Sequence, residues 1–258
     1  MSLIFLFIFG LVVGSFLNVL IDRLSNEESI LGRSYCDSCK KTLSPLTLIP
    51  VFSWIYLRGR SACCKKKISL WYPVVEIITA VAFILPFIIP TSSQYFVTDL
   101  VRLFSAHSHS TQLWFYLTTW LLLISASIVT IVADVKYHII PDEMTLLTGL
   151  IAFPFIYLNW NHVSGPLSSP FVGALAVMFP ILFLHLVTRG KGMGFGDVKY
   201  AFVMGLWLGL WDGLLALYLA FVLGGVVGIF YLLLGKKKMK STIAFGPFLV
   251  VCFLAMIL

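Results

Sequence analysis

Long runs of apolar residues, separated by short polar segments, dominate this chain. A transmembrane helix needs about 20 mostly apolar residues to cross the hydrocarbon core of a bilayer. Runs near that length predict spans at residues 3–21, 72–90, 112–133, 144–160, 170–188, 199–211, 214–234 and 243–258. The sixth run is separated from the seventh only by Asp212-Gly213. We therefore expect an all-α polytopic membrane protein with about eight transmembrane helices.

The polar segment after the first run is the longest in the chain. It divides the sequence into a first transmembrane helix at 1–22, a basic loop domain at 23–70 and a seven-helix membrane core at 71–258. No positively charged segment precedes the first run, and its first basic residue, Arg23, comes after it. We expect a retained membrane anchor here rather than a cleaved signal peptide.

Composition supports membrane insertion, and the distribution of charge predicts the orientation. The chain is 60% hydrophobic and only 11% charged, whereas soluble domains carry about 25% charged residues. Of the 18 Lys and Arg residues, all but Arg102 fall on alternate loops and hence on one face of the membrane. By the positive-inside rule that face is cytoplasmic and both termini point outward. The net charge of +7 therefore needs no nucleic-acid partner.

Two carboxylates lie at boundaries of predicted spans on the cytoplasmic face. Asp134 ends the third span, and Asp197 begins the sixth span within the sequence GMGFGDVK. Ionisable residues at such positions are costly and usually functional. A competing interpretation of the second segment is a solvated turn in which Asp197 caps a helix.

Aspartic proteases use a facing pair of carboxylates as their catalytic groups. Two neighbouring carboxylates cannot both ionise, so they share one proton. The charged member can deprotonate a water molecule that attacks a peptide carbonyl, while the protonated member polarises that carbonyl. No metal is needed for this reaction. Three glycines precede the second carboxylate and would let an extended substrate approach closely: Gly192, Gly194 and Gly196.

Asp142 and Glu143 compete with Asp134 for the role of second carboxylate. They follow Pro141, and acidic residues after a proline suit the first turn of a helix. On physical grounds Asp134 is favoured, because an uncharged run precedes it at the membrane boundary. Glu76 is a further carboxylate, inside the second span. Pairing with Arg23, which would make Glu76 structural, is favoured over a role in binding a charge of the substrate.

An ordered set of motifs extends over nearly the whole chain. It consists of GSFLNV (14–19) with Asp22-Arg23, CDSC (36–39), LIPVFSW (48–54), RGR (58–60), ISLWYPVVE (68–76), D-x6-PD from Asp134, GMGFGDVK (192–199) and FGPF (245–248). Taken together, these motifs resemble those of the type IV prepilin peptidases, membrane aspartic proteases of the GxGD type.

The resemblance implies that Asp134 and Asp197 are the catalytic pair. It implies removal of the basic leader of prepilins or pseudopilins at the cytoplasmic face of a bacterial cytoplasmic membrane. N-methylation of the new N-terminus, with S-adenosylmethionine as donor, is implied as well. A related protease with other membrane substrates, or a proton-coupled transporter that uses the two aspartates as a relay, is the alternative. A relay should place polar groups at successive depths, whereas both aspartates lie at one face.

The loop departs from the family pattern of two CxxC pairs, which is the pattern of a structural tetrathiolate zinc site. The first pair, Cys36 and Cys39, is intact, but the second reads Ser61-Ala-Cys63-Cys64. Adjacent cysteines need an altered turn to bind one metal ion. The sequence is compatible with zinc bound by Cys36, Cys39, Cys63 and Cys64, with a site that has lost its metal, or with a disulfide. The last is disfavoured in a reducing cytoplasm.

Overall fold

The computed structural model of this chain describes residues 2–26, 28–30, 32–36, 38–88, 100–101, 111–158, 170–234 and 244–258. These residues form helices joined by loops, with two isolated β-bridges in the first loop. Two compact units divide the chain: Met1–Ser92 with Asp99–Val129, and Ser93–Thr98 with Thr130–Leu258.

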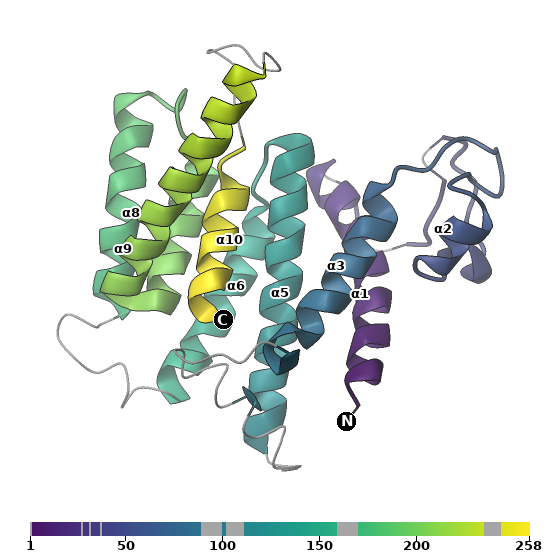
Figure 1. The fold of residues 1–258 in the computed structure, drawn as a ribbon, viewed down its shortest axis with the longest axis horizontal. Helices are drawn as coiled ribbons and strands as arrows, with labels where there is room; N and C mark the ends of the chain where they lie inside the picture. The colour runs from purple at the N-terminus through teal and green to yellow at the C-terminus, as the bar shows by residue number, and fades with distance from the viewer. Residues whose placement is uncertain are drawn as a thin grey trace. The chain divides into compact units, whose positions relative to one another are not determined.

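The first unit contains the helices that flank the long polar loop (Figure 1). Its elements are α1 (Leu3–Ser25), the 3-10 turn η1 (Pro45–Leu48), α2 (Phe52–Tyr56), α3 (Trp71–Ile88) and most of α5 (Thr111–Tyr137). Helix α1 continues three residues beyond the predicted domain limit at residue 22. The loop therefore begins one turn later than the apolar pattern predicted.

Small residues let α1 and α3 approach closely. A Cβ atom at Gly10 would lie 2.6 Å from the Cα of Ala80, and one at Gly14 would lie 2.7 Å from the Cα of Glu76. Glycines at this spacing allow membrane helices to pack backbone against backbone, where dispersion replaces the hydrophobic effect as the source of association. The close packing fixes the position of Glu76 relative to α1.

The expected pairing of Glu76 with Arg23 is wrong. One oxygen of the Glu76 carboxylate accepts the backbone N–H of Val51 at 2.7 Å. The guanidinium of Arg23 instead donates to the carbonyls of Ile30 and Arg33, at 2.6 and 3.1 Å. Each group is thus satisfied by loop backbone, which a pairing based on opposite charge alone cannot anticipate.

The second unit contains the end of α5 together with α6 (Asp142–Leu158), α8 (Pro170–Val187), α9 (Phe195–Leu233) and α10 (Gly246–Ile257). Acidic residues stand in the first turn of α6, as expected. Helices α8 and α9 pack closely, and α10 lies against α9 (Figure 1). Trp207 of α9 donates its indole N–H to the carbonyl of Thr148 in α6, at 2.9 Å.

Helix α9 is interrupted at Gly209, not at the expected Asp212-Gly213. Gly209 has φ 72° and ψ −161°, a conformation that side chains rarely tolerate. The helices meet tightly at this point, because a Cβ at Gly173 of α8 would lie 2.3 Å from the carbonyl carbon of Gly209. The break therefore follows from a glycine contact between helices rather than from the polar pair.

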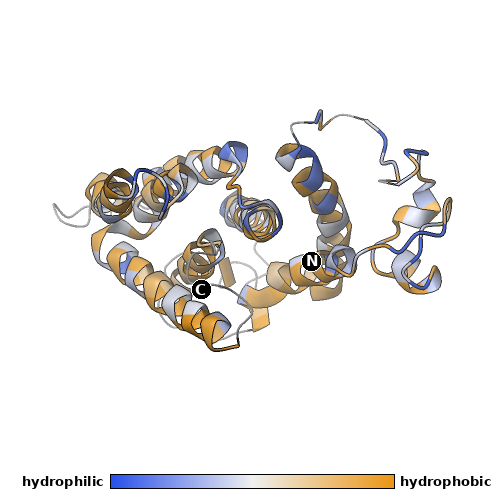
Figure 2. Ribbon diagram, turned by 90° about the horizontal axis from the view of Figure 1, so that it is seen from above, coloured by the Kyte–Doolittle hydropathy of each residue, from blue (hydrophilic) through white to orange (hydrophobic). Residues whose placement is uncertain are grey.

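Apolar helices agree with the all-α membrane class (Figure 2). Within the described residues, five helices are long and apolar enough to cross a membrane: α1, α3, α5, α8 and α9. Helix α10 is apolar but shorter. Helix α9 counts once despite its interruption, and α6 has 17 residues. The number of eight spans stays a prediction, while the class is confirmed.

Candidate active site

Asp134 is held at the C-terminal end of α5 by a backbone N–H from a distant part of the chain. Asp134 is 6% exposed, and its Oδ2 accepts the N–H of Gly246 at 2.9 Å. Gly246 is the first residue of α10, so its N–H has no partner inside the helix. The positive end of the helix dipole also favours a carboxylate there.

Asp197 is held in a related way at the start of α9. It is the third residue of that helix, and its Oδ2 accepts the N–H of Gly194 at 3.0 Å. The competing interpretation of Asp197 as a helix cap is therefore correct in its geometry. Asp197 is nevertheless only 8% exposed, which excludes a solvated turn. The same contact that caps the helix fixes the carboxylate.

The two carboxylates lie near each other in the second unit. They interact electrostatically, and Ile140 lies close to the glycine associated with each. A Cβ at Gly196 would lie 3.0 Å from the Cβ of Ile140, and one at Gly246 would lie 3.2 Å from its Cδ1. The fold thus brings together the two aspartates that the sequence singled out.

Asp142, the competitor for the second carboxylate, has a different environment. Both of its carboxylate oxygens are 2.7 Å from the Nζ of Lys199. The Asp142 side chain is 68% exposed and that of Lys199 is 39% exposed. Asp142 is thus solvent-exposed and paired with lysine, whereas Asp134 is buried, so the geometry favours Asp134 as the partner of Asp197.

The three glycines before Asp197 have close neighbours within the protein. Gly192 donates its N–H to the hydroxyl of Thr188 at 3.1 Å, and a Cβ at Gly192 would lie 2.9 Å from the Thr188 methyl carbon. Gly194 binds the carboxylate of Asp197, and Gly196 packs on Ile140. Packing alone therefore accounts for glycine at 192 and 196. Substrate approach over this loop stays a prediction.

Sequence reasoning assigned no role to Gly246. The residue belongs to FGPF, which was noted only as a family motif. A signal was present, because Pro247 follows it and proline favours the first turn of a helix. That signal locates a helix N-terminus with free N–H groups. It does not reveal which carboxylate, 112 residues away, receives one of them.

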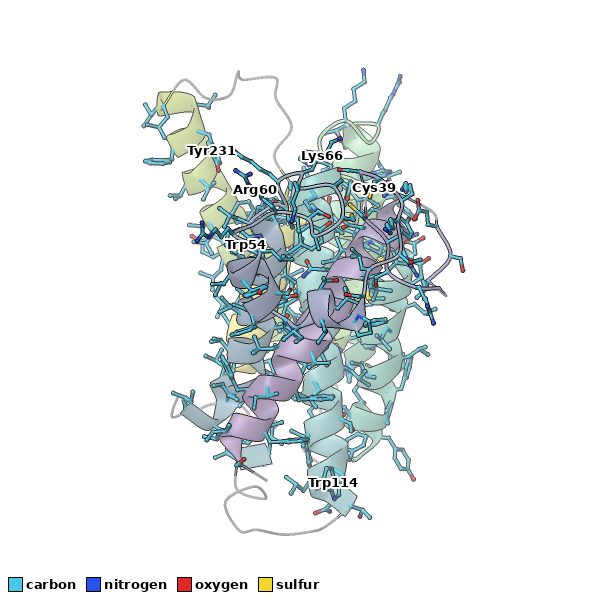
Figure 3. The ribbon with its side chains drawn as sticks, turned by 90° about the vertical axis from the view of Figure 1, so that its right-hand side faces the viewer. Cys39, Trp54, Arg60, Lys66, Trp114 and Tyr231 are labelled. Carbon is cyan, nitrogen blue, oxygen red and sulfur yellow. The ribbon has the colours of Figure 1, made fainter. Side chains whose placement is uncertain are left out.

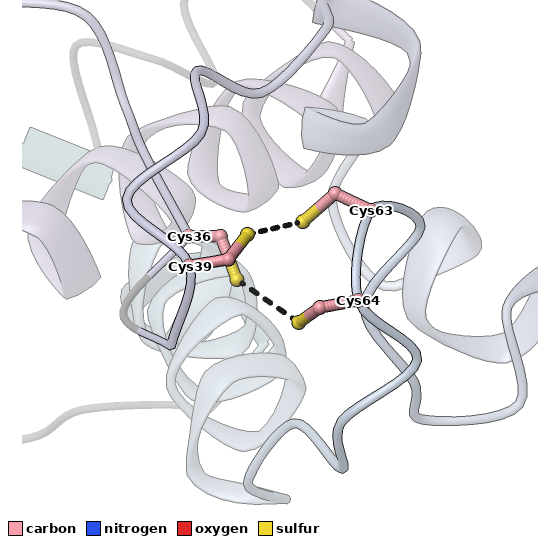
Figure 4. A group of neighbouring side chains, drawn as sticks. All are labelled: Cys36, Cys39, Cys63 and Cys64. Carbon is pink, nitrogen blue, oxygen red and sulfur yellow. Dashed lines mark hydrogen bonds between the residues drawn. The ribbon is translucent and has the colours of Figure 1, made fainter.

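In the first unit, the four loop cysteines form one cluster (Figure 4). Their sulfur atoms all lie within 4.8 Å of one another. The Sγ atoms of Cys36 and Cys64 are 3.7 Å apart, and those of Cys39 and Cys63 are 3.1 Å apart. All four cysteines are free, so the disulfide alternative has no support in this geometry.

Two similar turns present these cysteines. In the first, the N–H of Cys36 binds the carbonyl of Lys41, and the N–H of Lys40 binds the carbonyl of Cys36. In the second, Ser61 makes the corresponding contacts with Lys66 and Lys65. Lys40 and Lys65 share a left-handed φ, of 55° and 58°. Ser61 thus occupies the position of Cys36, and Cys64 that of Cys39.

Ser61 remains part of the cluster although it has no thiol. It is buried, and its Oγ is 3.4 Å from the Sγ of Cys36 and 3.1 Å from that of Cys63. Hydrogen bonding to Ser61, aided by backbone N–H groups, lowers the pKa of the Cys36 thiol to about 6. Ser61 also lowers the pKa of Cys63. Hydrogen bonding with Cys63 raises the pKa of Cys39 to about 12.

The cluster has the dimensions of a structural zinc site. Tetrahedral zinc with Zn–S bonds of about 2.3 Å places sulfur atoms about 3.8 Å apart. The sulfur separations in the cluster bracket this value. Cys63, although displaced by one residue from the CxxC pattern, reaches the cluster from the same turn as Cys64. The four residues therefore fit a tetrathiolate zinc ion.

Comparison with protein families assigns both parts of the chain. The family model described as "Bacterial Peptidase A24 N-terminal domain" matches residues 8–89. The model described as "Type IV leader peptidase family" matches residues 121–229. Asp134 and Asp197 lie within the second match, and the cysteine cluster lies within the first. No solved structure matches the chain.

Individual relatives resemble the chain over most of their length. A protein of Pectobacterium carotovorum named prepilin leader peptidase/N-methyltransferase is 31% identical over 271 residues, covering 95% of this chain and 88% of the relative. A protein of Aeromonas hydrophila with the same name is 30% identical, covering 95% of this chain and 86% of the relative. Another of that name, from Bacillus subtilis, is 29% identical, covering 94% of this chain and 88% of the relative.

Proposed function

The chain belongs to the type IV leader peptidase family, and on that premise we propose that Asp134 and Asp197 are its catalytic pair. Membership makes the protein a multi-pass membrane enzyme of prepilin processing and N-methylation. The observation that carries the assignment of residues is the pair of buried, interacting carboxylates, each fixed by a backbone N–H.

The two hydrogen bonds leave one oxygen of each carboxylate for chemistry. Oδ2 of Asp134 and Oδ2 of Asp197 are both occupied by backbone N–H groups. Within the described residues, neither Oδ1 has a hydrogen-bond partner. In the proposed reaction, the ionised member takes a proton from water through this oxygen. The protonated member donates to the scissile carbonyl and later protonates the leaving amine.

Positioning supports the same assignment. Each aspartate is held by a backbone N–H at a helix N-terminus, so neither can rotate away without losing a buried hydrogen bond. Preorganised groups of this kind need no rearrangement when charge moves during the reaction. The proposed substrates are prepilins or pseudopilins, cut after their basic leader. Gly192, Gly194 and Gly196 would lie under the extended chain.

The orientation in the membrane is part of the proposal. Basic loops on one face predict that Asp134 and Asp197 face the cytoplasm, with both termini outward. A leader rich in basic residues stays on that side, so the proposed site and substrate coincide. The transporter alternative would need polar groups at successive depths, and clustering of the two carboxylates argues against it.

Methyl transfer and the cysteine cluster form the second part of the proposal. S-adenosylmethionine would supply the methyl group for the new N-terminal amine. The geometry of the described residues identifies no binding site for this donor. We infer that Cys36, Cys39, Cys63 and Cys64 would hold zinc, which cross-links the two turns of the loop. Structural zinc supplies folding free energy rather than catalysis.

Co-expression with a prepilin tests the catalytic pair. Asp134→Asn and Asp197→Asn should each leave the protein in the membrane and abolish leader removal, which a mobility shift of the prepilin reports. Asn retains an oxygen that can accept the N–H of Gly246 or Gly194, so the fold is preserved while the shared proton is lost. Normal processing by either variant would refute the assignment.

A further inference from the structure

The loop between α1 and α3 exposes a group of large apolar side chains. Phe52, Ile55 and Tyr56 of α2 are 67%, 61% and 79% exposed. Their spacing of three and four residues places them on one side of the helix. Leu46 and Ile49 of the preceding turn are exposed as well. We call these five residues the apolar loop face.

The opposite side of α2 is anchored to the loop. Trp54 donates its indole N–H to the carbonyl of Ile68 at 3.4 Å, and a Cβ at Gly59 would lie 2.8 Å from the Trp54 ring. These contacts use the inner side of α2. They fix the rotation of α2 about its own axis and so hold the apolar loop face outward.

A buried hydrogen bond sets the depth of α2 along α3. The N–H of Val51, just before α2, binds the carboxylate of Glu76. Glu76 is the sixth residue of α3 (Trp71–Ile88), and five helical steps of about 1.5 Å place it about 7 Å below the start of that helix. Helix α3 is long and apolar enough to span a membrane. The start of α2 therefore lies level with the apolar part of α3 rather than beyond its end.

Basic residues follow the apolar loop face directly. Arg58, Arg60, Lys65, Lys66 and Lys67 are all exposed. In Figure 3, Trp54, Arg60 and Lys66 lie toward one end of the first unit, and Trp114 lies at the other. Exposed Lys and Arg beside an apolar surface suit the anionic phosphates of lipids. A basic leader peptide would be repelled by the same charges.

We propose that residues 46–56 are an interfacial membrane anchor, whose apolar loop face inserts into the acyl boundary of the leaflet while residues 58–67 meet lipid phosphates. Interfacial helices bury their apolar side about 5–10 Å into the boundary between headgroups and acyl chains, a depth comparable with the distance of about 7 Å between Glu76 and the start of α3. Tyr56 is amphipathic and suits the headgroup level. The anchor holds the cysteine-bearing loop against the membrane surface.

Photocrosslinking of the full chain in lipid nanodiscs tests this proposal. The photoreactive residue p-benzoylphenylalanine is introduced in place of Phe52 in one variant and of Lys66 in another. The nanodiscs contain phosphatidylethanolamine and phosphatidylglycerol. Both native side chains are exposed, so neither change removes packing. After irradiation, intact mass reports any adduct on the protein.

The proposal predicts lipid adducts at residue 52 in severalfold excess over residue 66. A third variant with the photoreactive residue in place of Ile55 should behave like the variant at 52. Equal lipid yields at 52 and 66 would overturn the proposal. An adduct at 52 with a second protein chain in place of lipid would overturn it too, because the face would then be a protein interface.

Discussion

The backbone N–H of Gly246 donates a hydrogen bond to the carboxylate of Asp134 across 112 residues of chain. The contact joins the N-terminus of the last helix to the C-terminal end of α5. It also requires glycine, because a Cβ at residue 246 would lie 2.7 Å from the bonded oxygen. Gly246 is thereby a positioning residue for the proposed catalytic pair.

Gly246→Ala should slow leader cleavage strongly while leaving the protein in the membrane. The added methyl group must displace the Asp134 carboxylate or Ile140, and a shift of about 1 Å in a catalytic group can cost about 100-fold in rate. Initial rates on a purified prepilin measure the effect. Gly225→Ala is the matched control, because a Cβ there meets nothing within 4 Å. Similar rates for the two variants would contradict the role of Gly246.

Asp142→Asn and Lys199→Met should both retain leader cleavage. The ion pair between these residues is exposed, and exposed pairs contribute at most about 1 kcal/mol. Cleavage within a few-fold of the native rate, with little change in thermal stability, is the expected result. Loss of cleavage in Asp142→Asn alone would transfer the role of second carboxylate from Asp134 to Asp142.

Zinc binding should depend on Cys63, and a cysteine at the position of Ser61 should be able to replace it. Cys63→Ser should lower zinc affinity, because it removes the fourth thiolate. Adding Ser61→Cys to that variant should restore affinity, since residue 61 occupies the position that corresponds to Cys36. Competition with a chromophoric chelator measures both variants. A zinc content of the native protein near zero would refute the metal site.

The hydroxyl of Ser61 should itself support the site. Hydrogen bonds to metal ligands change affinity by about 10-fold or more, and Ser61 lies within 3.4 Å of both Cys36 and Cys63. Ser61→Ala should therefore weaken zinc binding. Ser44→Ala serves as control, because Ser44 makes no side-chain capping bond at the start of η1. Equal affinities in the two variants would show that Ser61 has no such role.

Gly209→Ala should destabilise the membrane core. Gly209 has φ 72° and ψ −161°, a backbone region that is essentially restricted to glycine and costs other residues about 1–3 kcal/mol. A lower melting temperature in detergent is expected, whereas Gly225→Ala, within a regular helix, should not lower it. An unchanged melting temperature in Gly209→Ala would contradict the interruption of α9 at Gly209.

The lengths of the apolar runs predicted the helical class and most helix positions, because a membrane span needs a long uninterrupted apolar run. It placed the break of α9 at Asp212-Gly213, since polarity is visible in sequence and a positive φ at Gly209 is not. Charge topology predicted that Asp134 and Asp197 share a face. Helix-start signals pointed to free N–H groups near Gly194 and Gly246, but not to the contact between Gly246 and Asp134, which are 112 residues apart.

The partner of Glu76 likewise could not be predicted from the sequence. Opposite charge suggested Arg23, but the fold satisfies each with loop backbone at Val51, Ile30 and Arg33. Backbone groups outnumber charged side chains as partners, and only the folded path of the loop decides which of them is near. The second cysteine turn was anticipated in part. Ser61 in the place of a cysteine and the offset of Cys63 were visible in the sequence, but the contacts of the Ser61 hydroxyl with Cys36 and Cys63 were not.

Intact mass of a purified prepilin, incubated with the purified enzyme in lipid, tests the central claim most directly. The native protein should remove the leader, and a further methyl increment with S-adenosylmethionine would report transfer. Asp134→Asn and Asp197→Asn should each leave the prepilin at its full mass. Leader loss at an undiminished rate in either variant would contradict the assignment of Asp134 and Asp197 as the catalytic pair.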